Sequence, residues 1–217
     1  MLKYFSKFWS GKSKDSRVIA LDGDGVLIDY HEGYAMAWER AFGERPQVRD
    51  PQGYHPMDYW NVPRLGYSER LHLKEKGFTR DVWASMPAIA GAREACERLN
   101  AAGFSLVCVT AMSARYHKER EHNLHSLGFN VTRVYTAPHA GLGNPKARII
   151  SKLSPVAFVD DYLPYLQGIP QSTWSALIEG RKNNSPNRLQ GFKEPNSRHD
   201  SLIDFVQFWL GRKSELN

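Results

Sequence analysis

Residues 18–25 of the chain are Val18-Ile19-Ala20-Leu21-Asp22-Gly23-Asp24-Gly25. The first four of these residues are apolar and predict a short buried strand. The strand runs straight into two aspartates, each followed by a glycine that permits a tight turn and close approach of a ligand to the backbone. Ligands of open parallel sheets bind beyond the carboxyl ends of the strands. Asp22 and Asp24 are therefore candidate site residues, and alternation along an extended chain predicts that they face the same side.

Strands and helices alternate through the rest of the chain. Short apolar runs predict further strands at 104–109, 131–135, 156–159 and 173–178. Apolar residues at helical spacing predict helices at 31–42, 68–76, 79–85, 91–102, 113–127, 145–153 and 202–209, with Thr79 and Ser113 as N-caps. Residues 180–200 are expected to form a polar loop. The alternation predicts an α/β fold, with a Rossmann-like parallel sheet and helices on both of its faces.

The stretch 30–88 interrupts this alternation. Residues 44–64 within it are rich in proline, glycine and aromatic residues and are expected to be irregular. The whole stretch predicts a small, mainly helical cap inserted after the first strand. The expected parts of the chain are a basic N-terminal arm (1–17), an α/β core domain (18–29 and 89–217) and a cap subdomain (30–88).

The composition is that of an ordinary globular protein of 217 residues, with 41% hydrophobic and 24% charged residues. No apolar run approaches the roughly 18 residues that span a membrane. The two cysteines, Cys96 and Cys108, do not make the disulfide framework typical of small secreted domains, so a reducing, cytoplasmic setting is expected. The sequence gives no indication of the oligomeric state.

The formal net charge of +6 is unevenly distributed. Residues 1–17 contain five basic residues and one acidic residue, and residues 181–200 contain five basic and two acidic ones, whereas the body between them is nearly neutral. Proteins that bind a nucleic-acid groove usually carry a basic stripe across the folded face, so this pattern argues against a nucleic-acid partner. The arm has apolar residues on one side of a short helix and lysines on the other. It could contact an anionic membrane surface weakly, although packing on its own domain is the plainer expectation.

Further polar residues follow the later strands. Thr110 and Ala111 come at the end of the second predicted strand, Asp160 and Asp161 at the end of the fourth, and Lys146 opens the helix before the fourth. Several carboxylates share one site only with a cation, because like charges raise one another's pKa. Oxygen ligands without His or Cys favour a hard ion, and Mg²⁺ suits a site with room for water and a phosphate oxygen. Lys146 and Thr110 suit an anionic substrate oxygen.

This set of residues predicts phosphoryl transfer on a small phosphorylated substrate. A carboxylate beside Mg²⁺ can attack phosphorus and form an aspartyl-phosphate. A second carboxyl two residues later can protonate the leaving oxygen and afterwards activate water. In order and spacing, the run 22–27, the strand ending at Thr110, Lys146 and the strand ending in Asp160-Asp161 resemble the four motifs of the haloacid dehalogenase superfamily. The resemblance covers residues 18–161.

The resemblance implies a Mg²⁺-dependent phosphoric monoester hydrolase. By it, Asp22 would be the nucleophile, and Asp24 would be the general acid and base and would also give its backbone carbonyl to Mg²⁺. Members that cleave carbon–halogen bonds lack a carboxylate at the position of Asp24, so its presence favours phosphoryl transfer.

The same resemblance assigns the remaining candidates. Thr110, with Ala111, would hold the phosphoryl group, and Lys146 would stabilise it. Asp160 would be a metal ligand supported by Asp161.

Three alternatives stay open. The length of the cap and the entry Pro87-Ala88-Ile89-Ala90-Gly91-Ala92 are loosely similar to 5′(3′)-deoxyribonucleotidases, which makes a nucleotidase a candidate. A phosphosugar phosphatase or a phosphomutase is equally compatible, because the cap decides the substrate and no single cap residue can be carried over. A protein of another class, which binds a surface through the basic arm and has a degenerate hydrolase body, is the third.

Overall fold

Six parallel strands form one sheet in the computed structural model, which describes residues 17–138 and 143–214. The strands are β1 (Val18–Leu21), β2 (Ser105–Thr110), β3 (Arg133–Thr136), β4 (Ala157–Asp160), β5 (Trp174–Ile178) and β6 (Ser197–His199). Their order is β3-β2-β1-β4-β5-β6, and every neighbouring pair is parallel. The chain builds from β1 to β3 in one direction and then returns to place β4 on the other side of β1. The predicted α/β class and its parallel sheet are confirmed.

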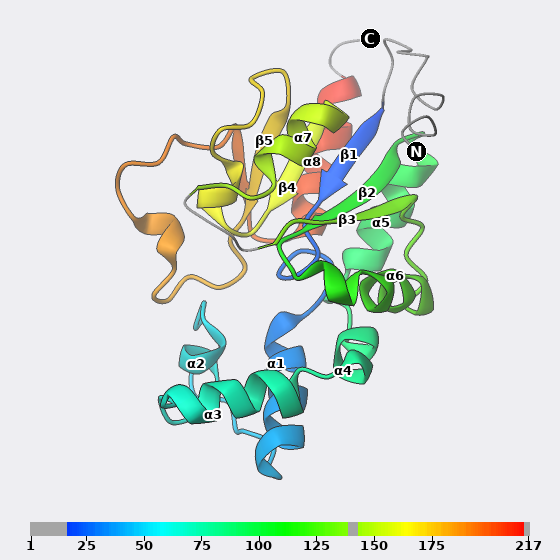
Figure 1. Ribbon diagram of the computed structural model, residues 1–217. Helices are drawn as coiled ribbons and strands as arrows, with labels where there is room; N and C mark the ends of the chain where they lie inside the picture. The colour runs from blue at the N-terminus through cyan, green and yellow to red at the C-terminus, as the bar shows by residue number, and fades with distance from the viewer. Residues whose placement is uncertain (1–16, 139–142, 215–217) are drawn as a thin grey trace, which may run out of the picture.

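Helices cover both faces of the sheet (Figure 1). The helical segments of this part of the chain are α5 (Ala92–Ala101), η2 (Ala114–Tyr116), α6 (His117–Ser126), α7 (Ala147–Leu153), η3 (Leu163–Leu166), η4 (Pro186–Arg188) and α8 (Leu202–Ser214). Ile19 and Leu21 of β1 pack in a cluster with α5 and α8, whereas Ala20 packs on the other face with α7 and η3. Because both faces are buried, the central strands are apolar throughout, as parallel strands usually are.

Residues 30–85 contain helical segments and no strand of the sheet. These segments are α1 (Tyr30–Phe42), α2 (Pro56–Tyr59), α3 (Tyr67–His72), the π-helical turn η1 (Leu73–Gly77) and α4 (Arg80–Ser85). Figure 1 shows them as a lobe beyond the carboxyl ends of the strands. The N-cap Asp29 accepts hydrogen bonds from the first turn of α1, and Gly43, with φ 85°, ends this helix in the left-handed region. The division of this lobe from the core as a cap subdomain remains our proposal.

Several local predictions are wrong. Residues 197–199 form the edge strand β6 inside the stretch expected to be a loop. The strand was not predicted because the polar sequence Ser-Arg-His has no hydrophobic pattern. Thr79 and Ser113 stand at N-cap positions, but neither side chain makes a capping hydrogen bond. The helix expected from 113 begins as the 3-10 turn η2 and becomes α-helical only at His117. The short helix α2 lies within the stretch expected to be irregular.

The predicted basic arm lies outside the described residues, apart from Arg17. The backbone carbonyl of Arg17 accepts a hydrogen bond from the N–H of Ser105 (2.9 Å), which continues the pairing of β1 with β2 by one bond. Within residues 17–138 and 143–214, no helix is long and apolar enough to cross a lipid bilayer.

His31 joins the first turn of α1 to the loop before α2. Its side chain is buried, and its Nε2 lies 3.2 Å from the carbonyl oxygen of Gly53. Its ring packs edge-on against Tyr59, with 5.0 Å between the centroids. Burial, together with the nearby charge of Arg181, lowers the pKa of His31 to about 4. The imidazole is therefore neutral in the folded protein near neutral pH.

The stability of the protein is expected to fall as the pH is lowered from 6.5 to 4, partly through His31. In this range the unfolded chain binds a proton at His31 that the folded chain does not bind, so the folded state loses up to about 3 kcal/mol. His31→Asn should remove this contribution, and His122→Asn, at an exposed position, should not. Urea unfolding of the three proteins at several pH values measures the difference. Parallel pH profiles for wild type and His31→Asn would contradict this account.

Candidate active site

The turn after β1 places the first aspartate at the end of the strand. The backbone N–H of Asp22 donates to the carbonyl oxygen of Val159 (2.9 Å), which joins the ends of β1 and β4. The chain then turns back on itself, and the N–H groups of Leu27 and Ile28 both donate to the carbonyl of Gly23 (2.9 and 2.8 Å). This pairing keeps the aspartate loop compact, so Asp22 leaves the strand at a defined position.

The backbone conformation at position 25 and the atoms around it both require glycine. Its φ of 84° lies in the left-handed region that residues with a side chain rarely adopt. A Cβ at this position would also overlap the carboxylate of Asp161. Glycine therefore lets the loop after β1 approach the loop after β4, as the sequence suggested for a ligand site.

Three carboxylates meet where the strand order reverses. Asp22 follows β1 and Asp160 ends the neighbouring β4, and ligand sites of open α/β sheets lie at such a reversal. Together with Asp161, these side chains offer oxygen atoms that all lie within 4.8 Å of one another. Asp160 is fully buried and Asp22 nearly so. The sequence placed Asp22 and Asp160 together correctly, and it treated Asp161 as a supporting residue only.

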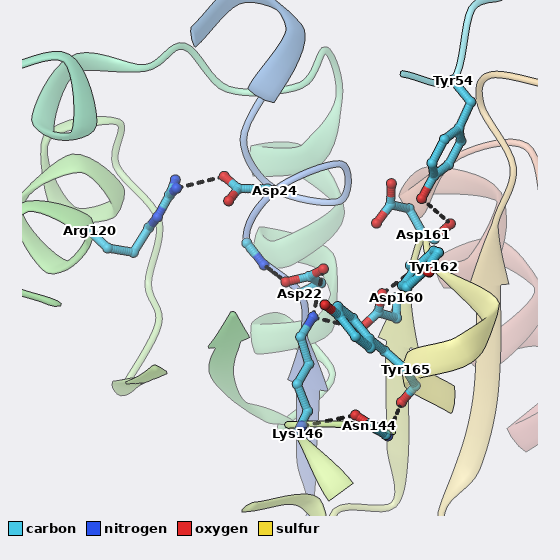
Figure 2. A network of polar contacts seen from close by, with 11 residues as sticks. Asp22, Asp24, Tyr54, Arg120, Asn144, Lys146, Asp160, Asp161, Tyr162 and Tyr165 are labelled. Atoms are coloured by element: carbon cyan, nitrogen blue, oxygen red, sulfur yellow. Dashed lines mark hydrogen bonds and ion pairs between the residues drawn. The ribbon is translucent and has the colours of Figure 1, made fainter. Parts of the chain in front are cut away.

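Lys146 bridges two of these carboxylates. Its Nζ lies 2.7 Å from Oδ2 of Asp22 and 2.7 Å from Oδ2 of Asp160, and its side chain is fully buried. Its ammonium group also lies over the ring of Tyr165, 4.8 Å from the centroid. Asn144 fixes the backbone here, because its Oδ1 accepts from the N–H of Lys146 (2.9 Å) and its Nδ2 donates to the carbonyl of Tyr165. Figure 2 shows Lys146 pointing into the acidic cluster.

The pKa values show that this cluster carries more negative charge than one lysine balances. Burial and the charge of Asp160 raise the pKa of Asp22 well above its ordinary value. Burial and the same neighbour raise the pKa of Asp161 to about 7. Burial alone would lower the pKa of Lys146, but Asp160 and Asp22 raise it, so this group stays charged. Without a further cation, the three carboxylates cannot all be ionised at neutral pH.

The donor set fits a divalent metal ion. Asp22, Asp160 and Asp161 supply only carboxylate oxygens, without His or Cys, which suits a hard cation such as Mg²⁺. A divalent cation would remove the repulsion that raises their pKa values. These three residues could therefore hold the metal, whereas the carboxylate of Asp24 lies outside the group.

Thr110 offers an unused hydroxyl beside the aspartate loop. It ends β2, is fully buried, and in the described parts of the chain its Oγ1 has no hydrogen-bond partner. A Cβ on Gly23 would come within 2.9 Å of this oxygen, so the glycine leaves the hydroxyl room. Thr110 and Ala111 both line the large cavity that contains Asp22. A buried donor without a partner points to a ligand oxygen.

Asp24 faces a different partner from Asp22. Its Oδ1 accepts a hydrogen bond from Nη2 of Arg120 (2.6 Å), whose side chain is fully buried in α6. Figure 2 shows the carboxylate of Asp24 directed toward Arg120, and that of Asp22 directed toward Lys146. The two carboxylates thus have different charge partners, although both residues line the same cavity.

Arg120 was not identified from the sequence. Its guanidinium lies over the ring of Trp83 (5.5 Å to the centroid) and reaches Asn123 (3.4 Å). Nδ2 of Asn123 in turn donates to the carbonyls of Ala84 and Met86 (3.3 and 2.8 Å). This network connects the position of Asp24 to the end of the inserted lobe. Arg120 is therefore a candidate positioning residue.

Arg120→Met is expected to lower both stability and turnover. The change would leave the partly buried Asp24 without its charge partner, at a cost of about 2–4 kcal/mol in the free energy of unfolding. A displaced Asp24 should lower kcat by about 10²-fold. Urea unfolding and steady-state kinetics measure the two effects. Lys118→Met, at an exposed position of the same helix, is the matched control. Wild-type values for Arg120→Met would rule out a positioning role.

A cavity of about 1390 Å³ opens beside the acidic cluster. Core residues, including Asp22, Asp24 and Thr110, line it together with residues of the inserted lobe. Its lobe side includes the aromatic residues Tyr30, Tyr34, Tyr54, Phe78 and Trp83. The hydroxyl of Tyr54 lies 3.5 Å from the carbonyl oxygen of Asp161, at the limit of a hydrogen bond, so the lobe reaches the acidic cluster.

The sequence matches no protein-family model and no curated protein. Its structure is similar to that of a predicted phosphoglycolate phosphatase from Haemophilus somnus 129pt, with 16% identity, 92% of this chain and 100% of the other covered, and a TM-score of 0.60. An L-2-haloacid dehalogenase from Xanthobacter autotrophicus gives 10% identity, coverage of 91% and 99%, and a TM-score of 0.55.

A third similar structure contains ligands. The D,D-heptose 1,7-bisphosphate phosphatase of B. bronchiseptica, solved with magnesium and phosphate, gives 17% identity, coverage of 90% and 98%, and a TM-score of 0.50. These likenesses define the class of fold, a Rossmann-like α/β fold with a lobe at the carboxyl ends of the strands. The chain has the fold of the haloacid dehalogenase superfamily, as the motifs predicted. At such identities the likeness establishes the fold and leaves the activity to be argued from the site.

Proposed function

We propose that the protein is a Mg²⁺-dependent phosphoric monoester hydrolase of the haloacid dehalogenase superfamily, acting through an aspartyl-phosphate on Asp22. The observation that carries the proposal is the buried group at the end of β1. There Lys146 lies 2.7 Å from both Asp22 and Asp160, and the hydroxyl of Thr110, at the end of the neighbouring strand β2, has no partner in the described residues. The proposed nucleophile, a cation and a hydrogen-bond donor for a phosphoryl oxygen thus lie at one edge of the sheet. Ligands bind at this edge in folds of this class.

The first step forms the covalent intermediate. A carboxylate oxygen of Asp22 attacks phosphorus, the bond from phosphorus to the ester oxygen breaks, and Asp24 gives the leaving oxygen its proton. Thr110 donates a hydrogen bond to a phosphoryl oxygen, and Lys146 balances charge on Asp22 and Asp160. Bound Mg²⁺, held by Asp22, Asp160 and Asp161, would neutralise the phosphoryl oxygens and align them for attack.

The second step returns Asp22 to its free state. Water attacks phosphorus, Asp24 takes its proton, and the bond from phosphorus to Asp22 breaks to release phosphate. The ion pair with Arg120 uses Oδ1 of Asp24. Oδ2 can therefore exchange the proton while Arg120 holds the side chain. The expected metal contact of the Asp24 carbonyl stays a prediction.

A turnover assay with and without metal tests the proposal. Purified protein should hydrolyse p-nitrophenyl phosphate or small phosphate esters with Mg²⁺, and EDTA should lower the rate by at least about 10³-fold, because the charge on the three carboxylates then repels the phosphate. Added Mg²⁺ should restore activity. Equal rates with Mg²⁺ and with EDTA would contradict the proposed metal dependence.

A phosphomutase would use the same Asp22 chemistry but return the phosphoryl group to a substrate hydroxyl. Analysis of products separates the two, because a hydrolase releases inorganic phosphate and a mutase releases an isomer. The loose likeness to 5′(3′)-deoxyribonucleotidases stays a prediction, and nucleoside monophosphates belong in the assay. The surface-binding alternative requires a degenerate site, whereas every expected residue type is present. Deletion of residues 1–17 should leave turnover unchanged if the protein is an enzyme.

A further inference from the structure

The cavity beside the carboxylates is larger than a phosphoryl group requires. Its volume of about 1390 Å³ exceeds the roughly 300–1,000 Å³ of common small-molecule sites. Asp22 and Thr110 line it from the core, and Arg70 and Lys74, of α3 and η1, line it from the inserted lobe. Figure 1 shows α3 on the side of the lobe remote from the sheet. A ligand that fills the cavity would extend well beyond the transferred group.

This cavity is lined by charged residues of both signs. Its carboxylates are Asp22, Asp24, Asp58 and Asp161, and its arginines and lysine are Arg49, Arg64, Arg70, Lys74, Arg115 and Arg181. Arg49 lies 3.7 Å from Asp58, and Arg181 lies 3.5 Å from Asp29. Within the part of the chain that the structure describes, the other four basic residues have no carboxylate oxygen within 4.0 Å. Four cations of the cavity are therefore available to a ligand.

Three of these four cations lie close together in the inserted lobe. Arg64, Arg70 and Lys74 are all exposed and line the cavity with the apolar residues Leu65 and Leu73. The hydrogen bond shown for Arg70 runs to the backbone carbonyl of Leu65 (3.1 Å), which leaves its charge unbalanced. Like charges gathered in one wall repel one another, and an anion bound between them relieves that repulsion.

The neighbouring acidic residue does not balance this wall. Glu69 of α3 accepts a hydrogen bond from the backbone N–H of Gly66 (2.6 Å) and is not among the residues that line the cavity. The carboxylates of Asp22, Asp24 and Asp161 thus lie at the sheet, whereas on the lobe side the carboxylate of Asp58 lies near Arg49 and leaves the three cations of α3, η1 and the preceding loop without a charge partner in the described residues. A substrate whose distal end is neutral would leave the cations of the lobe without an anionic partner.

We propose that the substrate carries a second anionic group, phosphate or carboxylate, at the end remote from the transferred phosphoryl group, and that Arg64, Arg70 and Lys74 bind it. This inference rests on the proposed function, which places the phosphoryl group of the same molecule against Asp22 and Thr110. Leu65 and Leu73 contact the carbon chain between the two anionic ends. The three basic residues determine specificity and take no part in the bond-breaking steps.

A matched set of substrates tests the proposal. Linear alkyl phosphates of equal chain length end in a hydroxyl, a carboxylate or a second phosphate, and several chain lengths are compared with Mg²⁺. The carboxylate or the phosphate series should exceed the hydroxyl series by about tenfold or more in kcat/KM, mainly through KM, because several exposed charge pairs each contribute a modest amount. The larger of the two effects identifies the distal group. Raised salt should reduce the preference.

Two variants locate the effect. The double variant Arg70→Gln/Lys74→Gln should lose the preference, so that its kcat/KM becomes similar for all three series. Lys76→Gln, at an exposed position of η1 that does not line the cavity, should keep the preference. Equal kcat/KM for all three series in wild type, or a preference that survives the double variant, would overturn the proposal.

Direct binding separates this inference from the proposed function. Calorimetry with Asp22→Asn and Mg²⁺ measures the affinity of the same compounds without turnover. Tighter binding of the dianionic compounds that depends on Arg70 and Lys74 supports the inference even if wild type hydrolyses none of them, in which case only the proposed hydrolase function fails. Equal binding of all three series overturns the inference, whatever the turnover.

Discussion

Asp22→Asn is expected to abolish Mg²⁺-dependent phosphate ester hydrolysis, with a loss of at least about 10⁴-fold in kcat. The amide cannot form the acyl phosphate that the proposed mechanism requires. Asparagine has nearly the same shape and keeps an oxygen for the hydrogen bond from the N–H of Gly23 (2.6 Å). The change also removes one of three mutually repelling carboxylates, so the metal-free variant should unfold at or above the wild-type temperature.

Steady-state hydrolysis of p-nitrophenyl phosphate, with circular dichroism as a check on folding, measures this effect. Asp81→Asn is a suitable control, because Asp81 is exposed and its carboxylate lies 4.0 Å from the guanidinium of Arg40, at the limit of an ion pair. A folded Asp22→Asn protein that retains a tenth or more of the wild-type rate would mean that another group attacks phosphorus.

Lys146→Met is expected to damage both catalysis and stability. The acidic cluster would lose the buried cation that lies 2.7 Å from Asp22 and from Asp160. Removal of one partner from a buried charge group costs about 3–5 kcal/mol in the free energy of unfolding. Loss of a cation at the phosphoryl site should lower kcat by about 10²–10³-fold.

The pH dependence of this variant follows from the carboxylates. Their pKa values are raised in the folded protein, that of Asp161 to about 7, so folding favours their protonated forms. Stability in EDTA should therefore fall as the pH rises from 6 to 8, more steeply in Lys146→Met than in wild type. Mg²⁺ should recover most of the loss at pH 8.

Urea unfolding at pH 6 and pH 8, in EDTA and in Mg²⁺, tests these expectations. Lys152→Met is the matched control, because Lys152 lies in the same helix α7 and is exposed. Wild-type stability of Lys146→Met in EDTA at pH 8 would show that the lysine does not balance the cluster.

Much of this site could be predicted because it depends on local sequence. Apolar runs mark β1 and β4 since both faces of the sheet are buried, and parallel strands bring their carboxyl ends to one edge. Asp22 and Asp160 thus had to lie near each other. Lys146 could be placed because Asn144 and Pro145 start its helix beside that edge.

The rest depends on contacts distant in the sequence. Arg120 pairs with Asp24 across 96 positions, and a single arginine in a highly charged helix resembles a solvated residue. One signal was present, since Arg120, Asn123 and Leu124 are spaced three and four apart and form the buried face of α6. The partner of Asp24 depends on how α6 packs beside the loop after β1, which the local sequence around Asp24 does not specify. β6 was missed because an edge strand needs no apolar pattern.

The central claim is that Asp22 carries the phosphoryl group during turnover. The most direct measurement is rapid quenching of the Asp24→Asn variant with p-nitrophenyl phosphate and Mg²⁺, followed by borohydride reduction and peptide mass spectrometry. This substrate is chosen because p-nitrophenolate leaves without the proton that Asp24 would supply in the first step. Loss of the proposed general base should slow hydrolysis of the intermediate, and reduction converts an aspartyl-phosphate to homoserine. Homoserine at position 22, dependent on both substrate and Mg²⁺, is the predicted result. Homoserine in place of a different aspartate would contradict the proposed mechanism. So would the absence of homoserine, if the wild-type protein turns over the same substrate.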